Sequence, residues 1–304
     1  MRRQLDTTDR PPDGARDPRR PRCPVTGRTD LELRASIPTP LLARHWRWTL
    51  GIDVRSELAS AGAHVDLYRA PVGVDFFWPP TPGGPDFYAR LHRRRWYSPA
   101  DRFEFSWAAD RLPTGARVLE IGAGAGRFAQ HVPHVSLAAV DRLDAAPDGA
   151  FDAVCAFQVL EHVTDPLDFV RDLVGRLAPG GELVLSVPDR DGHLSRASDL
   201  VLNAPPHHLA RWSRRGLAAL LEAAGLRVVE LAQAPVEDWE VTLYGMSRLA
   251  PSKAAGFERG LTRVIRRSGA AAAALVLGRR LVPTGAAGSS IVVRAARARA
   301  RARG

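Results

Sequence analysis

The sequence predicts an α/β protein with a Rossmann-like, doubly wound and mostly parallel sheet. Three observations predict this fold: short apolar runs recur after residue 116, helical patterns lie between several of them, and a glycine-rich turn directly follows the first run. Continuous apolar runs are typical of strands that are buried on both faces, as in parallel sheets. Strands that alternate with helices favour right-handed crossovers, with helices on both faces of the sheet.

Apolar runs mark the expected strands, and helix-capping residues mark two expected helices. The expected strands are Arg117–Ile121, Val135–Val140, Phe151–Val159, Glu182–Val187, Leu226–Leu231 and Ser289–Arg294. An Asp-Pro pair at 165–166 favours the start of one helix, which a Pro-Gly-Gly turn at 179–181 is expected to stop. Ser213 is expected to cap the other helix, and Gly225 to end it.

The stretch Val118–Phe128 is the most informative about chemistry. A buried strand runs there into a turn with Gly122, Gly124 and Gly126 at alternate positions, and then into an expected helix. Glycine lets a ligand approach the backbone closely and tolerates positive φ. Such a turn alone also fits nicotinamide or flavin proteins, or a purely structural turn. Glu120 and the GxGxG spacing favour S-adenosylmethionine, because a carboxylate before the loop can reach the cationic amino-acid end of that ligand.

Three segments resemble motifs of the class I S-adenosylmethionine-dependent methyltransferases. Val118–Phe128 resembles their motif I, Phe151–Val163 their fourth-strand motif, and Leu177–Leu183 the turn before their fifth strand. The match covers about residues 115–232 and is similar to the branch that includes ubiquinone-type O-methyltransferases. The resemblance implies S-adenosyl-L-methionine as cofactor and methyl transfer to a small-molecule or lipid-like acceptor, with oxygen as the favoured target atom.

The resemblance also implies where the cofactor binds. Glu120, Gly122 and Gly124 are expected around its methionine end, and Ala123 and Gly126 are further expected cofactor-binding residues. Gln158 is expected near the carboxyl end of the fourth strand, where ligands lie in such sheets. In the family an acid after the second strand holds the ribose hydroxyls, and Asp141 is the candidate. Asp144 is the candidate for the adenine, and both acids also fit ordinary loop positions.

One helix-strand pair of the family pattern is missing from the sequence. Only residues 142–150 separate Asp141 from the next expected strand, which is too few for a helix and a third strand. The third strand is normally at the sheet edge, so its loss need not disrupt the sheet, but it would open the adenine side. The alternative function is therefore a degenerate methyltransferase fold that acts as a non-catalytic binding or scaffold protein. A nicotinamide-dependent oxidoreductase is a third hypothesis, which Glu120 disfavours.

Methyl transfer to a hydroxyl is helped by a base, and histidine is the natural choice near neutral pH. His162 follows the fourth strand, and His207 and His208 follow the fifth, so all three are expected at the ligand-facing edge. A similar proline-histidine-tryptophan loop occurs in relatives of this branch. Each histidine fits a structural role about as well. No metal site is predicted, because adjacent histidines rarely face one site and no acid partner is evident.

The N-terminal part is expected to be a disordered basic tail over residues 1–30 and an aromatic-rich α/β attachment over residues 31–110. The segment Cys23–Gly27 resembles a zinc-binding CPxCG knuckle in which Thr26 stands in place of the second thiolate. Its expected partner region, residues 68–73, has no cysteine. Structural zinc normally needs four protein ligands. We therefore expect a zinc-ribbon-like shape without metal.

The methyltransferase domain is expected over residues 111–296, with a helical insertion at 236–287 and an Arg/Ala tail at 297–304. The insertion fits a cap over the acceptor pocket, a peripheral membrane contact or a plain packing helix. The residues just past the fifth strand, Asp189, Arg190 and Asp191, fit either the acceptor pocket or a solvated loop.

The formal net charge of +10 is concentrated at the two ends of the chain. Residues 1–28 hold eight Arg against four Asp, and residues 294–304 hold five Arg and no acid. This distribution disfavours a specific nucleic-acid partner. Neither a signal peptide nor a transmembrane segment is evident, which predicts a cytoplasmic protein. The sequence leaves the oligomeric state open.

Overall fold

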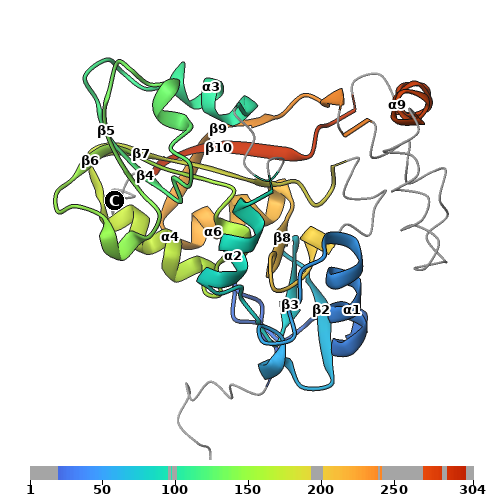
Figure 1. Cartoon of the computed structure of the whole chain (residues 1–304). Helices are drawn as coiled ribbons and strands as arrows, with labels where there is room; N and C mark the ends of the chain where they lie inside the picture. The colour runs from blue at the N-terminus through green and yellow to red at the C-terminus, as the bar shows by residue number, and fades with distance from the viewer. Residues whose placement is uncertain are drawn as a thin grey trace, which may run out of the picture.

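The structure is a computed structural model that describes residues 20–94, 97, 101–192, 201–238, 240–241, 270–282 and 286–298. Within these residues the chain forms two sheets, as Figure 1 shows. A six-stranded sheet has the order β5-β4-β6-β7-β10-β9, and a four-stranded sheet has the order β1-β2-β3-β8.

The six-stranded sheet is mostly parallel. Its strands are β4 (Arg117–Ile121), β5 (Ser136–Val140), β6 (Phe151–Phe157), β7 (Leu177–Pro188), β9 (Leu226–Gln233) and β10 (Ser290–Arg297). β4 pairs in parallel with β5 and β6, and β6 pairs in parallel with β7. β10 runs antiparallel between β7 and β9. The sheet confirms the predicted fold class, and each expected strand forms.

Helices cover both faces of this sheet (Figure 1). α3 (Phe103–Ala109) lies on one face, and α4 (Pro166–Gly175) and α6 (Arg214–Ala223) lie on the other. As predicted, Ser213 caps α6, because its hydroxyl oxygen accepts a hydrogen bond from Gly216 N at 3.1 Å. Packing on both faces explains why the strand sequences are continuously apolar.

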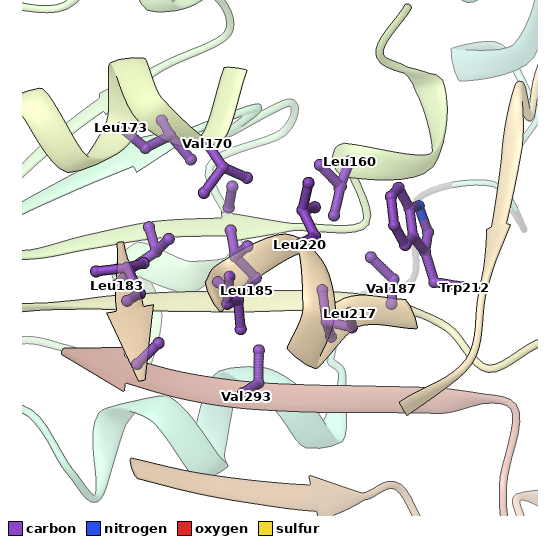
Figure 2. Packing of buried hydrophobic residues seen from close by; sticks show 14 of the residues in the cluster. Leu160, Val170, Leu173, Leu183, Leu185, Val187, Trp212, Leu217, Leu220 and Val293 are labelled. Atoms are coloured by element: carbon purple, nitrogen blue, oxygen red, sulfur yellow. The ribbon is translucent and has the colours of Figure 1, made fainter. Parts of the chain in front are cut away.

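The largest hydrophobic core lies between the sheet and the helices α4 and α6. Figure 2 shows Leu173 of α4, Leu220 of α6 and Leu185 of β7 among the side chains of this core, and all three are fully buried. On the opposite face the rings of Phe128 and Phe157 lie 4.8 Å apart and pack under α3. These two cores hold the carboxyl ends of the strands in fixed positions.

The missing helix-strand pair is confirmed. Between β5 and β6 the described chain has only a 3₁₀ turn, Leu143–Ala145, and no strand. β5 is therefore the edge of the sheet. An edge strand needs hydrogen bonds on one side only, so the sheet closes without a third strand.

The helix expected after the glycine loop does not form. A 3₁₀ turn, Phe128–Gln130, takes its place. Only nine residues, 127–135, separate the loop from β5, and Pro133 stands among them. Proline lacks an N–H and clashes with the preceding turn of a helix, so this short segment has no room for a regular helix.

The Pro-Gly-Gly turn at 179–181 does not stop a helix, and this expectation is wrong. α4 already ends at Gly175, because Leu177 pairs with Phe151 at the start of β7. The turn lies inside β7, at a shift of register against β6. A Cβ atom on Gly181 would come within 2.8 Å of the Phe151 carbonyl oxygen, so glycine is needed for the strands to approach there.

The four-stranded sheet forms the N-terminal unit. Its elements are β1 (Glu32–Pro38), α1 (Thr39–Leu50), β2 (His64–Ala70), β3 (Val74–Trp78), α2 (Pro85–His92) and β8 (Ala210–Trp212). β8 comes from far along the chain and pairs with β3, so residues 31–110 do not complete this sheet alone. Trp46, Phe77 and Phe87 form a separate core here. Trp212 of β8 is fully buried in the larger core.

Residues 20–30 do not form the expected disordered tail. Cys23 and Val25 are buried in the same core as Val74 of β3. A tight turn spans residues 23–28, in which Gly27 N donates to Cys23 O at 2.8 Å and Cys23 N donates to Arg28 O at 2.9 Å. Burial of the two apolar side chains orders the segment. Residues 1–19 lie outside the described residues, and the likeness to a zinc ribbon remains a prediction.

α9 (Ala270–Leu281) belongs to the expected helical insertion, most of which lies outside the described residues. Its basic end contacts the rest of the chain through Arg279, which pairs with Asp238 at 2.8 Å. Among the described helices, none combines the length and the apolar character needed to cross a bilayer. Residues 299–304 of the expected tail also lie outside the described part.

Candidate functional site

The glycine loop connects β4 to the 3₁₀ turn at Phe128. Gly122, Gly124 and Gly126 all have positive φ, and the N–H groups of Gly122 and Ala123 both donate to Val140 O, at 2.8 and 3.2 Å. A Cβ atom on Gly122 would lie 2.3 Å from a methyl carbon of Val159. The loop therefore requires glycine at residue 122 for both backbone and packing reasons.

Asp141 holds the glycine loop against the end of β5. Its Oδ1 accepts a hydrogen bond from Gly124 N at 2.7 Å, the only hydrogen bond to this side chain within the described residues. The residue is exposed, so its second carboxylate oxygen faces solvent beside the loop. Asp144, the adenine candidate, is also exposed and pairs with Arg142 at 2.6 Å.

Glu120 is the buried acid of the loop. It is 3% exposed, and its Oε2 has no hydrogen-bond partner among the described residues. Burial, and secondarily the charge of Asp141, raise the pKa of Glu120 to about 7. A buried carboxylate oxygen without a donor is costly, and a ligand with N–H groups or positive charge would satisfy it.

Gln158 lies at the carboxyl end of β6, as expected, but its side chain is engaged elsewhere. Its Nε2 donates to Glu104 Oε1 at 3.0 Å, to Ser290 Oγ at 2.9 Å and to Ser186 Oγ at 3.3 Å. These bonds tie α3 to β7 and β10. Among the described non-glycine residues only Gln158 has a positive φ, 56°. Such strain at the carboxyl edge of a sheet is common at functional sites.

The three candidate histidines, His162, His207 and His208, come together in one buried cluster. The rings of His207 and His208 stack with centroids 4.4 Å apart, and the ring of His162 lies 4.5 and 5.0 Å from them. The nitrogens that could bind one ion all lie within 4.8 Å of one another. The adjacent histidines therefore face one site, contrary to the sequence-based expectation.

Backbone carbonyls orient two of the rings. His162 Nδ1 lies 2.6 Å from His207 O, and His207 Nδ1 lies 2.9 Å from Leu202 O. A carbonyl oxygen only accepts, so each Nδ1 carries the hydrogen and each Nε2 carries the lone pair of a neutral ring. His207 Nε2 meets the hydroxyl of Tyr97 at 2.8 Å. Burial lowers the pKa of His162 to about 4 and holds those of His207 and of His208 well below 6.5, so the rings are neutral at pH 7.

Glu161 supplies the acid partner that the sequence did not reveal. It is 1% exposed, and neither carboxylate oxygen has a hydrogen-bond partner among the described residues. Its Oε1 lies 3.8 Å from His162 Nε2 and 4.0 Å from His208 Nε2. Burial raises the pKa of Glu161 to about 8. We refer to Glu161, His162, His207 and His208 as the His/Glu cluster.

Aromatic side chains connect the His/Glu cluster to the glycine loop. His92 at the end of α2 comes within 3.9 Å of the position that a Cβ on Gly124 would take, and its ring lies 5.1 Å from the Tyr97 ring. Tyr97 in turn contacts His207, and Tyr88 of α2 packs edge-on against His162 with centroids 5.7 Å apart. The loop and the cluster thus border one region beneath α2.

Four residues of this region are not among the predicted site residues: Glu161, Tyr88, Tyr97 and His92. Glu161 is adjacent to His162 in the fourth-strand motif, so the sequence could have indicated it as a site residue. Tyr88, Tyr97 and His92 belong to the N-terminal unit, and nothing in their local sequence indicates that α2 lies over the strand ends. Their role depends on how the two sheets pack.

Asp189, Arg190 and Asp191 line a different cavity, of about 880 Å³. The other residues around it come from the Thr29–Glu32 segment, the β2–β3 turn and the start of α6, and include neither the glycine loop nor the His/Glu cluster. Arg190 pairs there with Asp75 at 3.0 Å. These residues therefore do not border the region beneath α2.

Comparison with known proteins gives one family match. Residues 90–231 match a family described as a methyltransferase domain. The segment includes most of the region beneath α2: the glycine loop, Glu161 and all three histidines of the cluster.

Two curated proteins and one solved structure illustrate the similarity. A ubiquinone biosynthesis O-methyltransferase of Xanthomonas axonopodis pv. citri is 28% identical over 170 residues, which cover 42% of this chain and 69% of that protein. A probable S-adenosylmethionine-dependent methyltransferase of Mycolicibacterium smegmatis is 39% identical over 82 residues, 27% of this chain and 31% of that protein. The crystal structure of a possible histamine N-methyltransferase from Thermotoga maritima aligns with a TM-score of 0.42 and 18% identity, and covers 70% of this chain and 97% of that one.

Proposed function

The chain is a class I S-adenosylmethionine-dependent methyltransferase, and from this premise we propose that it methylates a hydroxyl oxygen of a small-molecule acceptor. Its cofactor, S-adenosyl-L-methionine, supplies an electrophilic methyl group carried on a sulfonium sulfur. Two observations support oxygen as the target: the similarity to an enzyme named as an O-methyltransferase, and a cluster of lone-pair-bearing side chains near the glycine loop.

Glu120, the loop glycines and Asp141 would hold the cofactor. The observation that supports this assignment is the buried Oε2 of Glu120, which lacks a donor that the cofactor's ammonium group would provide. The exposed carboxylate of Asp141 would receive the ribose hydroxyls while it keeps its hydrogen bond to Gly124 N. Ala123 would line the same loop, and Gln158 would support the site by fixing the end of β6.

The His/Glu cluster would activate the acceptor hydroxyl. A hydroxyl is a weak nucleophile until its proton is removed or its O–H bond is polarised. His162 is the member that reaches the surface, with 18% of its side chain exposed, and its Nε2 carries a lone pair. His207 would be a positioning residue, because both of its ring nitrogens already have partners. His208 would complete the cluster from the buried side.

The observation that carries the proposal is the juxtaposition of the glycine loop and the His/Glu cluster beneath α2. The contact between Tyr97 and His207 and the approach of His92 to Gly124 link the two parts. Positioning of acceptor and cofactor at adjoining places is a large contribution that a methyltransferase can make to the rate. No observation within the described residues favours a purely non-catalytic scaffold.

Calorimetric titration with S-adenosylmethionine and S-adenosylhomocysteine tests the cofactor site. We expect binding that Asp141→Asn weakens, while Asp144→Asn, a change in the neighbouring exposed acid, tests whether that residue contributes to adenine binding. Folded wild-type chain that binds neither compound would refute the cofactor assignment.

A panel of acceptors tests the target atom. Phenols and lipid-linked phenols should become methylated at oxygen, with the product located by mass spectrometry, and matched amines should not. Methylation of the amines alone would refute O-methylation and leave the methyltransferase assignment intact.

A further inference from the structure

The His/Glu cluster contains the donor atoms of a metal site. His162 Nε2, which carries a lone pair, and His208 Nε2 both lie near the carboxylate of Glu161, whose Oε1 is 3.8 and 4.0 Å from the two nitrogens. Two imidazoles and one carboxylate form a ligand set that divalent transition metals use in proteins. A ring nitrogen of His207 also lies within 4.8 Å of those of the other two histidines, but its Nε2 would bind a metal only in exchange for its contact with the Tyr97 hydroxyl.

Hydrogen bonds already orient two histidines of the cluster, His162 and His207, as metal-bound histidines are oriented. A histidine that binds a metal usually donates its other ring N–H to a backbone carbonyl or carboxylate, which fixes the ring and its tautomer. His162 does so toward His207 O, and His207 does so toward Leu202 O.

The carboxylate of Glu161 is the independent observation that points to a ligand. It is 99% buried, and within the described residues no hydrogen bond from another side chain or backbone group reaches either oxygen. A buried polar group left without a partner is unfavourable, and a buried charge is more so. A cation between Glu161 and the histidines would satisfy the carboxylate directly.

The distances are compatible with a small divalent ion. Donor atoms at about 2.0–2.1 Å from a tetrahedral zinc ion lie about 3.3 Å from one another. The observed separations of 3.8 and 4.0 Å exceed this value by about 0.5–0.7 Å, and the histidine nitrogens lie within 4.8 Å of one another, so side-chain rotations would bring the donors together around an ion. We propose that Glu161, His162 and His208 bind one divalent transition-metal ion of the zinc class, with His207 as an additional or supporting ligand.

Only the role of the bound ion in catalysis rests on the proposed function. His162 Nε2 cannot be a free base while it binds a metal, so the ion would polarise the acceptor hydroxyl in its place. The binding of the ion itself depends on neither cofactor nor acceptor. Metal binding and methyl transfer can therefore fail separately.

The test is titration of the chelator-treated full chain with Zn²⁺ by calorimetry and with Co²⁺ by visible absorption. We expect one ion per chain and a Co²⁺ spectrum of a four- or five-coordinate site without a thiolate charge-transfer band, because neither Cys23 nor Cys155 belongs to the cluster. Glu161→Gln and His208→Ala should each weaken Zn²⁺ binding by more than about 10-fold. His64→Ala, at an exposed position of β2, should leave it unchanged.

S-adenosylhomocysteine binding and circular dichroism show whether each variant is folded. Absence of stoichiometric Zn²⁺ and Co²⁺ binding to folded wild-type chain would overturn the proposal. Folded Glu161→Gln and His208→Ala variants that bind the ions as tightly as the wild type would overturn it as well. A thiolate band in the Co²⁺ spectrum would move the site to a cysteine and exclude the proposed ligands.

Discussion

Replacement of Glu120 by glutamine should change how stability depends on pH. Glu120 is 3% exposed, and its pKa lies near 7 in the folded chain against 4.5 in the unfolded chain. The folded state therefore holds this proton more tightly than the unfolded state. The stabilising contribution of protonation is fully present below pH 4.5 and is lost as the pH rises through about 7.

The two pKa values set the magnitude. One pKa unit corresponds to about 1.4 kcal/mol, so linkage predicts a loss of about 2 kcal/mol in the free energy of unfolding between about pH 5.5 and 8. Glutamine has nearly the same shape and no charge, so Glu120→Gln should not show this loss. Measured by chemical denaturation of the cofactor-free chain, the variant should gain about 2 kcal/mol relative to the wild type over that range.

Cofactor binding should show the reciprocal effect. A bound ammonium group would favour the carboxylate form of Glu120, so the affinity of the wild type for S-adenosylhomocysteine should rise about 10-fold from about pH 6 to 8. The affinity of Glu120→Gln should be lower at pH 8 and nearly independent of pH. A stability difference between wild type and variant that stays constant from about pH 5.5 to 8 would refute the assignment of a raised pKa to Glu120.

Three further substitutions test the packing, each by chemical denaturation. Gly122→Ala should destabilise the chain by about 2–4 kcal/mol, because residue 122 has a positive φ and the added Cβ would clash with Val159. Adding Val159→Ala should recover part of this loss, and no recovery would mean that backbone strain alone causes it. Ser213→Ala should cost about 1–2 kcal/mol through the lost cap of α6, with Ser213→Asn as the milder control. Leu220→Ala should cost about 2–5 kcal/mol because the side chain is fully buried between α6 and the sheet, and a loss below about 1 kcal/mol would contradict the described core.

The central strands are predictable because burial on both faces leaves a direct mark in the sequence. The run from Arg117 to Ile121 coincides with β4, and the short interval after Asp141 correctly indicates the missing helix-strand pair. The missing pair is predictable from chain length alone, because the segment 142–150 is too short to form both a helix and a strand. The helix boundaries are less predictable: Leu177 continues the apolar stripe of α4, yet pairing with Phe151 takes it into β7.

The sequence predicts the histidines of the His/Glu cluster but not how they pack together. The sequence indicates that His162, His207 and His208 follow strands whose ends meet at one edge, but 45 residues separate His162 from His207. The stacking of His207 on His208 depends on the loop that leads into β8, and β8 pairs with a sheet of the N-terminal unit. Local sequence holds no information about that pairing. For the same reason the position of Tyr97 beside the cluster could not be inferred.

The missing helix after the glycine loop bears on which ligand the loop can bind. A helix N-terminus after such a loop carries partial positive charge and unpaired N–H groups, which bind the pyrophosphate of a dinucleotide. In this chain a single 3₁₀ turn follows, and the N–H groups of Gly122, Ala123, Gly124 and Gly126 already donate to acceptors within the protein. A pyrophosphate would find no helix dipole, would have to compete for these four N–H groups, and would meet the carboxyl groups of Glu120 and Asp141. A ligand that carries ammonium and sulfonium charges and no phosphate has the opposite requirement, which these two acids meet. The departure from the regular fold therefore disfavours nicotinamide cofactors and is compatible with S-adenosylmethionine.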